Sequence, residues 1–277
     1  MDYLAPTALE EAFSRLARDP VRIVAGGTDY YPSRKTGPLT CDLLDVTRIQ
    51  GLRGITSENG GWRIGATTRW SDIVRADLPP AFDGLKAAAR EVGSIQIQNA
   101  GTVAGNLCNA SPAADGVPPL LTLDAKVEIG SEKAVRVVPL SDFITGVRTT
   151  DLHPGEMVTA VLVPPLPDAA RSGFEKLGAR RYLVISITMT AVLLALDESG
   201  RIAEARVAVG ACSPVACRLH ELEASLVGQT PAEAEIDPRH LSPLAPIDDV
   251  RGSAGYRSDV VAEQIARALR AAGGRNG

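Results

Sequence analysis

Two short glycine-rich segments constrain this chain more than any other feature of its sequence. The first, Ala25 to Asp29 (AGGTD), follows an apolar stretch, and the second, Asn99 to Asn106 (NAGTVAGN), follows a helical pattern that ends at Gly93. One such segment alone predicts only a tight turn, because glycine adopts positive φ at little cost. Two in one chain favour a ligand cradle, since backbone N–H groups of glycine can approach a phosphate closely.

The standard nucleotide fingerprints are missing. The sequence contains neither the GxGxxG of a Rossmann dinucleotide site nor the GxxxxGK[ST] of a P-loop. Any dinucleotide must therefore be held in another way. The stretch from 94 to 121 is predicted to be a second glycine-rich polar loop, and its candidate ligand contacts are Gly101, Thr102, Gly105, Asn106, Asn109, Ser111 and Asp115.

The rest of the pattern predicts mixed α and β structure. Apolar runs predict strands at 21–25, 41–46, 62–66, 126–129, 135–138 and 157–163, and a two-piece helix at 68–92. The proline-rich residues 164–170 predict a linker, which places a domain boundary near 170. Beyond it, strands at 186–196 and 202–209 and helices at 219–227 and 258–272 predict a compact α+β unit.

Composition excludes several classes of protein. The 277 residues carry a net charge of -4, and the basic residues are scattered along the sequence. The sequence therefore lacks the clustered basic residues typical of proteins that bind nucleic acid. No leader or apolar run long enough for a membrane span is visible, so a cytoplasmic protein is expected. The four cysteines lack metal-site spacing and the three histidines are scattered. We therefore expect no metal site and no catalytic side chain on this chain.

The two glycine segments together resemble a known family. AGGTD at 25–29 and NAGTVAGNLCNASPAAD at 99–115 resemble the flavin-binding subunit of the xanthine dehydrogenase and carbon monoxide dehydrogenase family of molybdenum hydroxylases. The resemblance continues through DFITGVRTTDLHPGE at 142–156, FEKLGARRY at 174–182 and the closing YRSDVVAEQIARALRAA. It therefore covers nearly the whole chain. Members commonly have glycine where Ala104 stands.

The resemblance implies a fold, a cofactor and a set of site residues. The fold would be an FAD-binding domain at 1–170, similar to the vanillyl-alcohol oxidase type, with α+β subdomains at about 1–57 and 58–170. A C-terminal domain of the CO dehydrogenase flavoprotein type would follow at 171–277. By the same similarity, FAD would be bound by Val24, Ala25, Gly26, Gly27, Thr28, Asp29, Thr102, Val103, Ala104, Gly105, Asn106, Asp115 and Lys176.

The resemblance also implies partners. Substrate would be oxidised at a molybdenum cofactor on a large subunit, and electrons would cross two [2Fe-2S] clusters on a small subunit to FAD here, then pass to an external acceptor. A dimer of heterotrimers would be the assembly. Two alternatives stay open at this point: a self-contained FAD oxidoreductase of the same flavin fold, or a docking subunit without cofactor. Neither the substrate nor the acceptor can be read from this chain.

Overall fold

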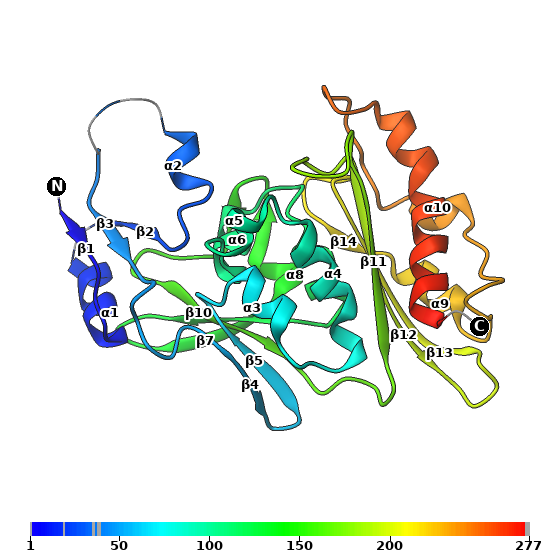
Figure 1. Ribbon diagram of the computed structural model, residues 1–277, viewed down its shortest axis with the longest axis horizontal. Coiled ribbons are helices and arrows are strands. Elements are labelled where there is room, and N and C mark those ends of the chain that lie inside the picture. Colours follow the sequence, from blue (N-terminus) through cyan, green and yellow to red (C-terminus); the bar gives the residue numbers. More distant parts are fainter. Residues whose placement is uncertain (1, 19, 35–36, 38–39, 275–277) are drawn as a thin grey trace.

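The N-terminal unit is a small parallel sheet covered by a helix. The computed structural model describes residues 2–18, 20–34, 37 and 40–274. Three strands pair in the order β1-β3-β2, and α1 packs on them through Phe13, which shares a buried cluster with Leu44 and Met157. This unit lies at one end of the molecule (Figure 1). Its elements are β1 (Tyr3–Leu4), α1 (Leu9–Arg18), β2 (Arg22–Val24), α2 (Tyr30–Ser33) and β3 (Leu43–Asp45).

The middle unit is a five-stranded antiparallel sheet in the order β4-β5-β10-β6-β7. Its strands are β4 (Ile55–Glu58), β5 (Gly61–Gly65), β6 (Lys126–Gly130), β7 (Val135–Pro139) and β10 (Met157–Val163), and a separate pair is β8 (Ile144–Gly146) with β9 (Thr149–Thr150). Its helices are α3 (Trp70–Arg75), η1 (Pro80–Phe82), α4 (Asp83–Glu91), α5 (Ile95–Gln98), α6 (Val103–Asn109), α7 (Val117–Thr122) and α8 (Leu140–Phe143).

The prediction of one long polar loop at 94–121 is wrong. This stretch forms the three short helices α5, α6 and α7, and α7 is buried throughout. Pro118 and Pro119 occupy the first turn of α7, where backbone N–H groups have no partner within the helix and proline is tolerated. Asn99 and Gly116 therefore mark helix ends here, and Gly105 and Asn106 lie within α6, so these residues do not form an irregular loop.

The C-terminal unit is a four-stranded antiparallel sheet in the order β11-β12-β13-β14. Side chains alternate across β12: Val192 and Leu194 pack under α10, whereas Leu193 joins the core of the middle unit. Because both faces are covered, β12 is an almost wholly buried strand. The elements are β11 (Arg171–Leu177), β12 (Thr188–Leu196), β13 (Ile202–Gly210), β14 (Cys217–Arg218), α9 (His220–Leu226), η2 (Pro238–Leu241) and α10 (Ala254–Gly273).

This arrangement places the C-terminal sheet directly against the middle unit. Helix α4 contacts β11, and α7 contacts β12 and β13, while α10 covers the opposite face (Figure 1). The predicted α+β organisation is confirmed. The boundaries at 57 and 170 stay predictions; in the structure β4 pairs with β5, and β11 begins at Arg171. No helix among the described residues has the length and apolar character needed to cross a membrane.

Candidate functional site

The first glycine segment forms a tight corner between β2 and α2. Val24 ends the strand as a buried residue, and Gly27 then adopts a φ of 67°. This backbone angle favours glycine, whereas the nearest atom to a Cβ at this position, Cε2 of the exposed Tyr31 at 2.5 Å, belongs to a side chain that can move. In the described part of the chain, the backbone N–H groups of Gly26, Gly27 and Thr28 donate no hydrogen bond. They are free donors at a bend, the arrangement that receives anions.

The second segment lies against the first, backbone to backbone. A Cβ on Gly26 would stand 1.9 Å from the carbonyl oxygen of Ala100 and 2.9 Å from the amide nitrogen of Gly101. A Cβ on Gly101 would in turn lie 3.3 Å from Oγ1 of Thr28. Only residues without a side chain allow this approach. The structure therefore brings the two glycine segments, far apart in sequence, into one cradle, which we define as residues 24–29 and 100–106.

Most N–H groups in the first turn of helix α6 donate hydrogen bonds within the protein. The helix therefore forms a wall of the cradle and offers few free donors. The N–H of Val103 donates to the Thr68 carbonyl at 2.9 Å, and that of Ala104 donates to the Ala66 carbonyl at 3.2 Å. Oγ1 of Thr102 caps the helix by accepting from the Gly105 N–H at 3.1 Å. The N–H of Thr102 donates no hydrogen bond within the described residues, so unpaired donors lie in both segments of the cradle. Ala104 has a helical backbone and is buried, so its Cβ is accommodated without strain.

Asn106 leaves one polar atom without a partner inside the cradle. Its side-chain Oδ1 is buried and accepts no hydrogen bond among the described residues. A Cβ on Gly116 would lie 3.0 Å from this oxygen and 2.3 Å from the Trp70 ring, so the glycine lets both side chains pack closely against its backbone. An unpaired buried acceptor costs about 1–3 kcal/mol, which a ligand donor would recover. Free N–H donors and an unpaired buried acceptor, held together by closely packed glycine segments, fit a dinucleotide such as FAD.

Asp115 and Lys176 form a buried ion pair with each other. Lys176 Nζ lies 2.7 Å from Asp115 Oδ2, and their side chains are only 6% and 9% exposed. The hydroxyl of Ser186 donates to Asp115 Oδ1 at 2.5 Å, and Lys176 also donates to the carbonyl of Glu91 at 3.0 Å. Burial raises the pKa of Asp115, and the Lys176 ammonium acts against that shift. The pair joins the helical layer of the middle unit to β11.

A pocket of about 490 Å³ opens beside this pair, between α4, β11 and the loop that follows β11. Burial raises the pKa of Glu175 at its wall, while Arg267 acts in the opposite direction. The rim is basic, with the exposed Arg180 and Arg181. The lining residues are Ala87, Glu91, Phe174, Glu175, Lys176, Leu177, Gly178, Arg180, Arg181 and Val184. The pocket is large enough for an aromatic ring system.

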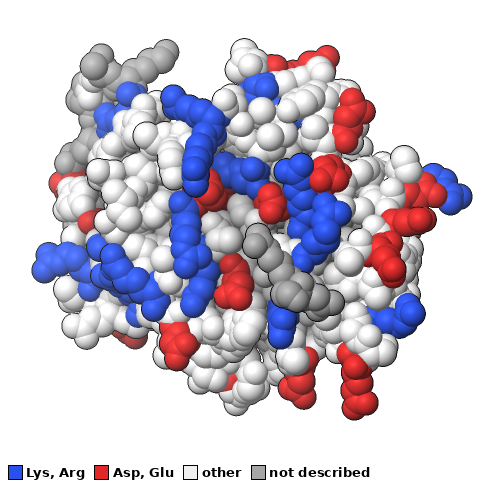
Figure 2. Space-filling model, turned by 45° about the vertical axis from the view of Figure 1, so that its right-hand side comes forward, with Lys and Arg blue, Asp and Glu red and all other residues white. Residues whose placement is uncertain are grey.

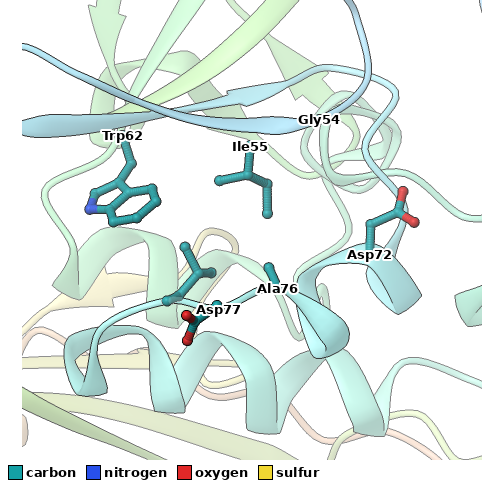
Figure 3. A pocket seen from close by; sticks show the side chains of 7 residues that line it. Gly54, Ile55, Trp62, Asp72, Ala76 and Asp77 are labelled. Atoms are coloured by element: carbon teal, nitrogen blue, oxygen red, sulfur yellow. The ribbon is translucent and has the colours of Figure 1, made fainter.

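A second, smaller pocket lies apart from the cradle. It has a volume of about 290 Å³ and is lined by Gly54, Ile55, Trp62, Asp72, Ala76, Asp77 and Leu78 (Figure 3). The carboxylate of Asp72 is already held by two hydrogen bonds from Arg53, each 2.9 Å long. None of the residues predicted to bind the cofactor lines this pocket.

Two residues at the site were not singled out by sequence reasoning. Ser186 accompanies the buried pair, and Arg148 reaches the cradle from the turn between β8 and β9. Arg148 stands within GVRTT, a stretch that is part of the resemblance to the flavin-binding family. The sequence around Ser186 or Arg148 does not predict that either residue belongs to the site, because only the tertiary fold brings it there.

Comparison with known proteins identifies relatives over the full length. Residues 1–166 match the family described as "FAD binding domain in molybdopterin dehydrogenase", and residues 174–272 match "CO dehydrogenase flavoprotein C-terminal domain". The chain is 32% identical to the xanthine dehydrogenase FAD-binding subunit of Escherichia coli O157:H7, covering 99% of this chain and 97% of that one. It is 31% identical to the 6-hydroxypseudooxynicotine dehydrogenase complex subunit alpha of Paenarthrobacter nicotinovorans, covering 97% and 93%.

The fold also matches solved structures. Reconstituted CO dehydrogenase from Oligotropha carboxidovorans contains a chain that superposes with a TM-score of 0.89 at 27% identity, covering 99% of this chain and 97% of that chain. Both glycine segments and Asp115 lie within the residues matched by the first family, and Lys176 lies within those matched by the second.

Proposed function

Because this chain belongs to the FAD-binding medium-subunit family of the molybdenum hydroxylases, we propose that it carries FAD in the cradle and passes electrons from a [2Fe-2S] subunit to an external acceptor. The observation that carries the proposal is the backbone contact of Gly26 with Ala100 and Gly101. It joins two glycine segments into one surface with unpaired N–H donors. A diphosphate is the group that such a surface accepts.

The residues of this chain bind and orient; they supply no acid or base of their own to the redox step. We assign the diphosphate to the N–H groups of Gly26, Gly27 and Thr28, and a hydrogen bond from a ligand donor to Oδ1 of Asn106. The buried pair would stand toward the ring end of the cofactor, where the pocket of about 490 Å³ offers room. Bound FAD supplies the electron transfer, which the protein tunes through its charges and by excluding water.

The basic rim of that pocket supports an exchange of electrons with a charged partner. Figure 2 shows the C-terminal side of the molecule, across which Lys and Arg side chains form an interrupted band. Arg180 and Arg181 at the pocket, and Arg267 on α10, are exposed. Such a band raises the rate of encounter with an acidic protein or an anionic acceptor.

The relatives support a heteromeric setting. One is named as an FAD-binding subunit and another as one subunit of a dehydrogenase complex. We propose that a large molybdenum-cofactor subunit and a small subunit with two [2Fe-2S] clusters complete the enzyme. The dimer of heterotrimers and the cytoplasmic location stay predictions.

The proposal is tested by a visible absorption spectrum of the purified chain, expressed alone and with its neighbouring subunits. Flavin released on denaturation is identified by chromatography. We expect one FAD per chain, and reduction of that flavin when the complete complex receives its substrate. A folded, colourless chain that takes up no added FAD would overturn the proposal and favour the docking subunit. Substrate turnover by the chain alone would favour the self-contained oxidoreductase.

A further inference from the structure

Arg148 is held in an unusual backbone conformation at the edge of the cradle. It occupies the turn between β8 and β9 with a φ of 58°, in the left-handed region that residues with side chains seldom adopt. Its own N–H donates to the carbonyl of Ala110, at the end of α6, at 2.8 Å. Ala110 is itself left-handed, with a φ of 45°. The turn is thereby fixed to the same helix that forms one wall of the cradle.

The guanidinium of Arg148 connects the first glycine segment to the end of helix α6. Its Nη1 lies 3.2 Å from Oδ2 of Asp29 in the first segment, and it also donates to the side-chain oxygen and the carbonyl of Asn109, which ends α6. The Arg148 and Asp29 side chains are 52% and 57% exposed. An ion pair so open to water contributes little to stability. A contribution to stability therefore does not explain why an arginine occupies this left-handed position.

The two segments of the cradle contain no positive charge that could neutralise a bound phosphate. Residues 24–29 and 100–106 contain no Lys or Arg, and Asp29 brings a negative charge. FAD would add two negative phosphate charges beside it. Arg148 brings a cation to this edge of the cradle, where it donates to Asp29 of the first segment and to Asn109 at the end of α6. Its bonds all run from Nη1, so Nε and Nη2 donate nothing within the described part of the chain. A guanidinium offers these remaining donors in a planar fork that matches a phosphate.

We propose that Arg148 binds the diphosphate of FAD while its Nη1 neutralises Asp29. This inference rests on the proposed function and adds to it a residue outside the two glycine segments. It predicts that Arg148 strengthens the binding of FAD but not that of riboflavin, because riboflavin has no phosphate.

The test measures the affinity of the flavin-free full chain for FAD and for riboflavin by flavin fluorescence. Arg148→Gln should weaken FAD binding about 10- to 100-fold, the range expected for a lost hydrogen bond to a charged group. Arg148→Lys should recover part of the loss, and riboflavin binding should stay unchanged in both. Arg239→Gln is the matched control, since that arginine also sits in an exposed ion pair, with Asp237, but in η2 of the C-terminal unit. Circular dichroism and the thermal midpoint establish that each variant is folded.

A double-mutant cycle with Asp29→Asn separates the two roles of the arginine. If Arg148 contacts phosphate, the double variant Asp29→Asn/Arg148→Gln will still bind FAD much more weakly than Asp29→Asn alone. Equal affinity of these two variants would show that Arg148 only neutralises Asp29, and would overturn the proposal. A wild-type chain that binds no FAD would instead refute the proposed function, whereas normal FAD binding by folded Arg148→Gln would refute this inference alone.

Discussion

Lys176 of the C-terminal sheet lies 2.7 Å from Asp115 of the middle unit, and both side chains are almost completely buried. Burial of a charge is costly unless a partner and further hydrogen bonds compensate for it. Ser186 and the carbonyl of Glu91 provide those bonds. The contact between the two units therefore contains a buried ion pair, in which Lys176 and Asp115 each compensate for the burial of the other's charge.

Removing one half of this pair should destabilise the chain strongly. Lys176→Met leaves Asp115 buried without its cation, and we expect a loss of about 3–5 kcal/mol in the free energy of unfolding. Asp115→Asn/Lys176→Met should recover most of this loss, because no unpaired charge remains. Lys133→Met, at an exposed position, is the control. Urea unfolding of the flavin-free chain measures all three, and a Lys176→Met variant as stable as the control would contradict the expectation.

Gly26→Ala tests the contact between the glycine segments. The added Cβ would fall 1.9 Å from the backbone oxygen of Ala100, and that backbone cannot give way as a flexible side chain would. The two walls of the cradle must separate, so we expect FAD content to fall from one per chain to near zero. Gly255→Ala is the control, since its Cβ meets nothing within 4 Å and lies in a helix. Flavin absorbance per chain gives the answer; undiminished FAD in Gly26→Ala would show that the contact is dispensable.

Asn106→Leu should separate cofactor binding from stability. The substitution keeps the approximate shape while removing the buried oxygen that has no partner. The flavin-free chain should lose no more than about 0.5 kcal/mol, since no hydrogen bond of that oxygen is broken, whereas FAD affinity should fall about tenfold. Thermal unfolding and fluorescence titration measure the two effects. A variant that binds FAD normally would remove Asn106 from the site.

The cluster around Arg136 predicts a loss of stability in acid. The guanidinium binds Glu156 through two hydrogen bonds of 2.8 Å, and these hold the pKa of Glu156 below its usual value near 4.3. The resulting stability is present above that value and is lost as the pH falls through the lower pKa of the folded chain. Glu156→Gln should therefore cost about 1 kcal/mol at neutral pH.

The cost of Glu156→Gln should shrink toward zero as the pH falls below about 4, because Glu156 then loses its charge in the wild type as well. Glu132→Gln, at an exposed position, is the control. Urea unfolding at a series of pH values measures the difference. A penalty that stays constant down to pH 3 would contradict the assigned ion pair.

The sheets were predictable from sequence where apolar runs are long. The runs at 157–163 and 202–209 correspond to β10 and to most of β13, because a strand buried on both faces needs continuous apolar residues. Strand β11 was missed, since Arg171–Leu177 mixes charged and apolar residues and follows a proline-rich stretch. The helices of the second segment were missed because α5 and α6 are too short to establish a helical period.

The site was predictable only in part. Each glycine segment is visible locally, but the contact between Gly26 and Ala100 depends on how α5 is placed against β2, which no local pattern encodes. The resemblance pointed to Asp115 and Lys176 as cofactor residues, but their bond to each other emerges only from the packing of β11 on α4. Arg148 needed the whole β8–β9 turn in place before its relation to Asp29 could be recognised.

The placement of Lys176 limits how such proteins can be recombined. Its strand belongs to the C-terminal sheet, while the carboxylate it neutralises belongs to the preceding unit. A chimera that joins the first 170 residues of this chain to the C-terminal part of a relative would keep Asp115 and take the residue that pairs with it from the relative. Such an exchange can succeed only where the donor brings its own lysine at this position, so the two units are expected to be inherited together.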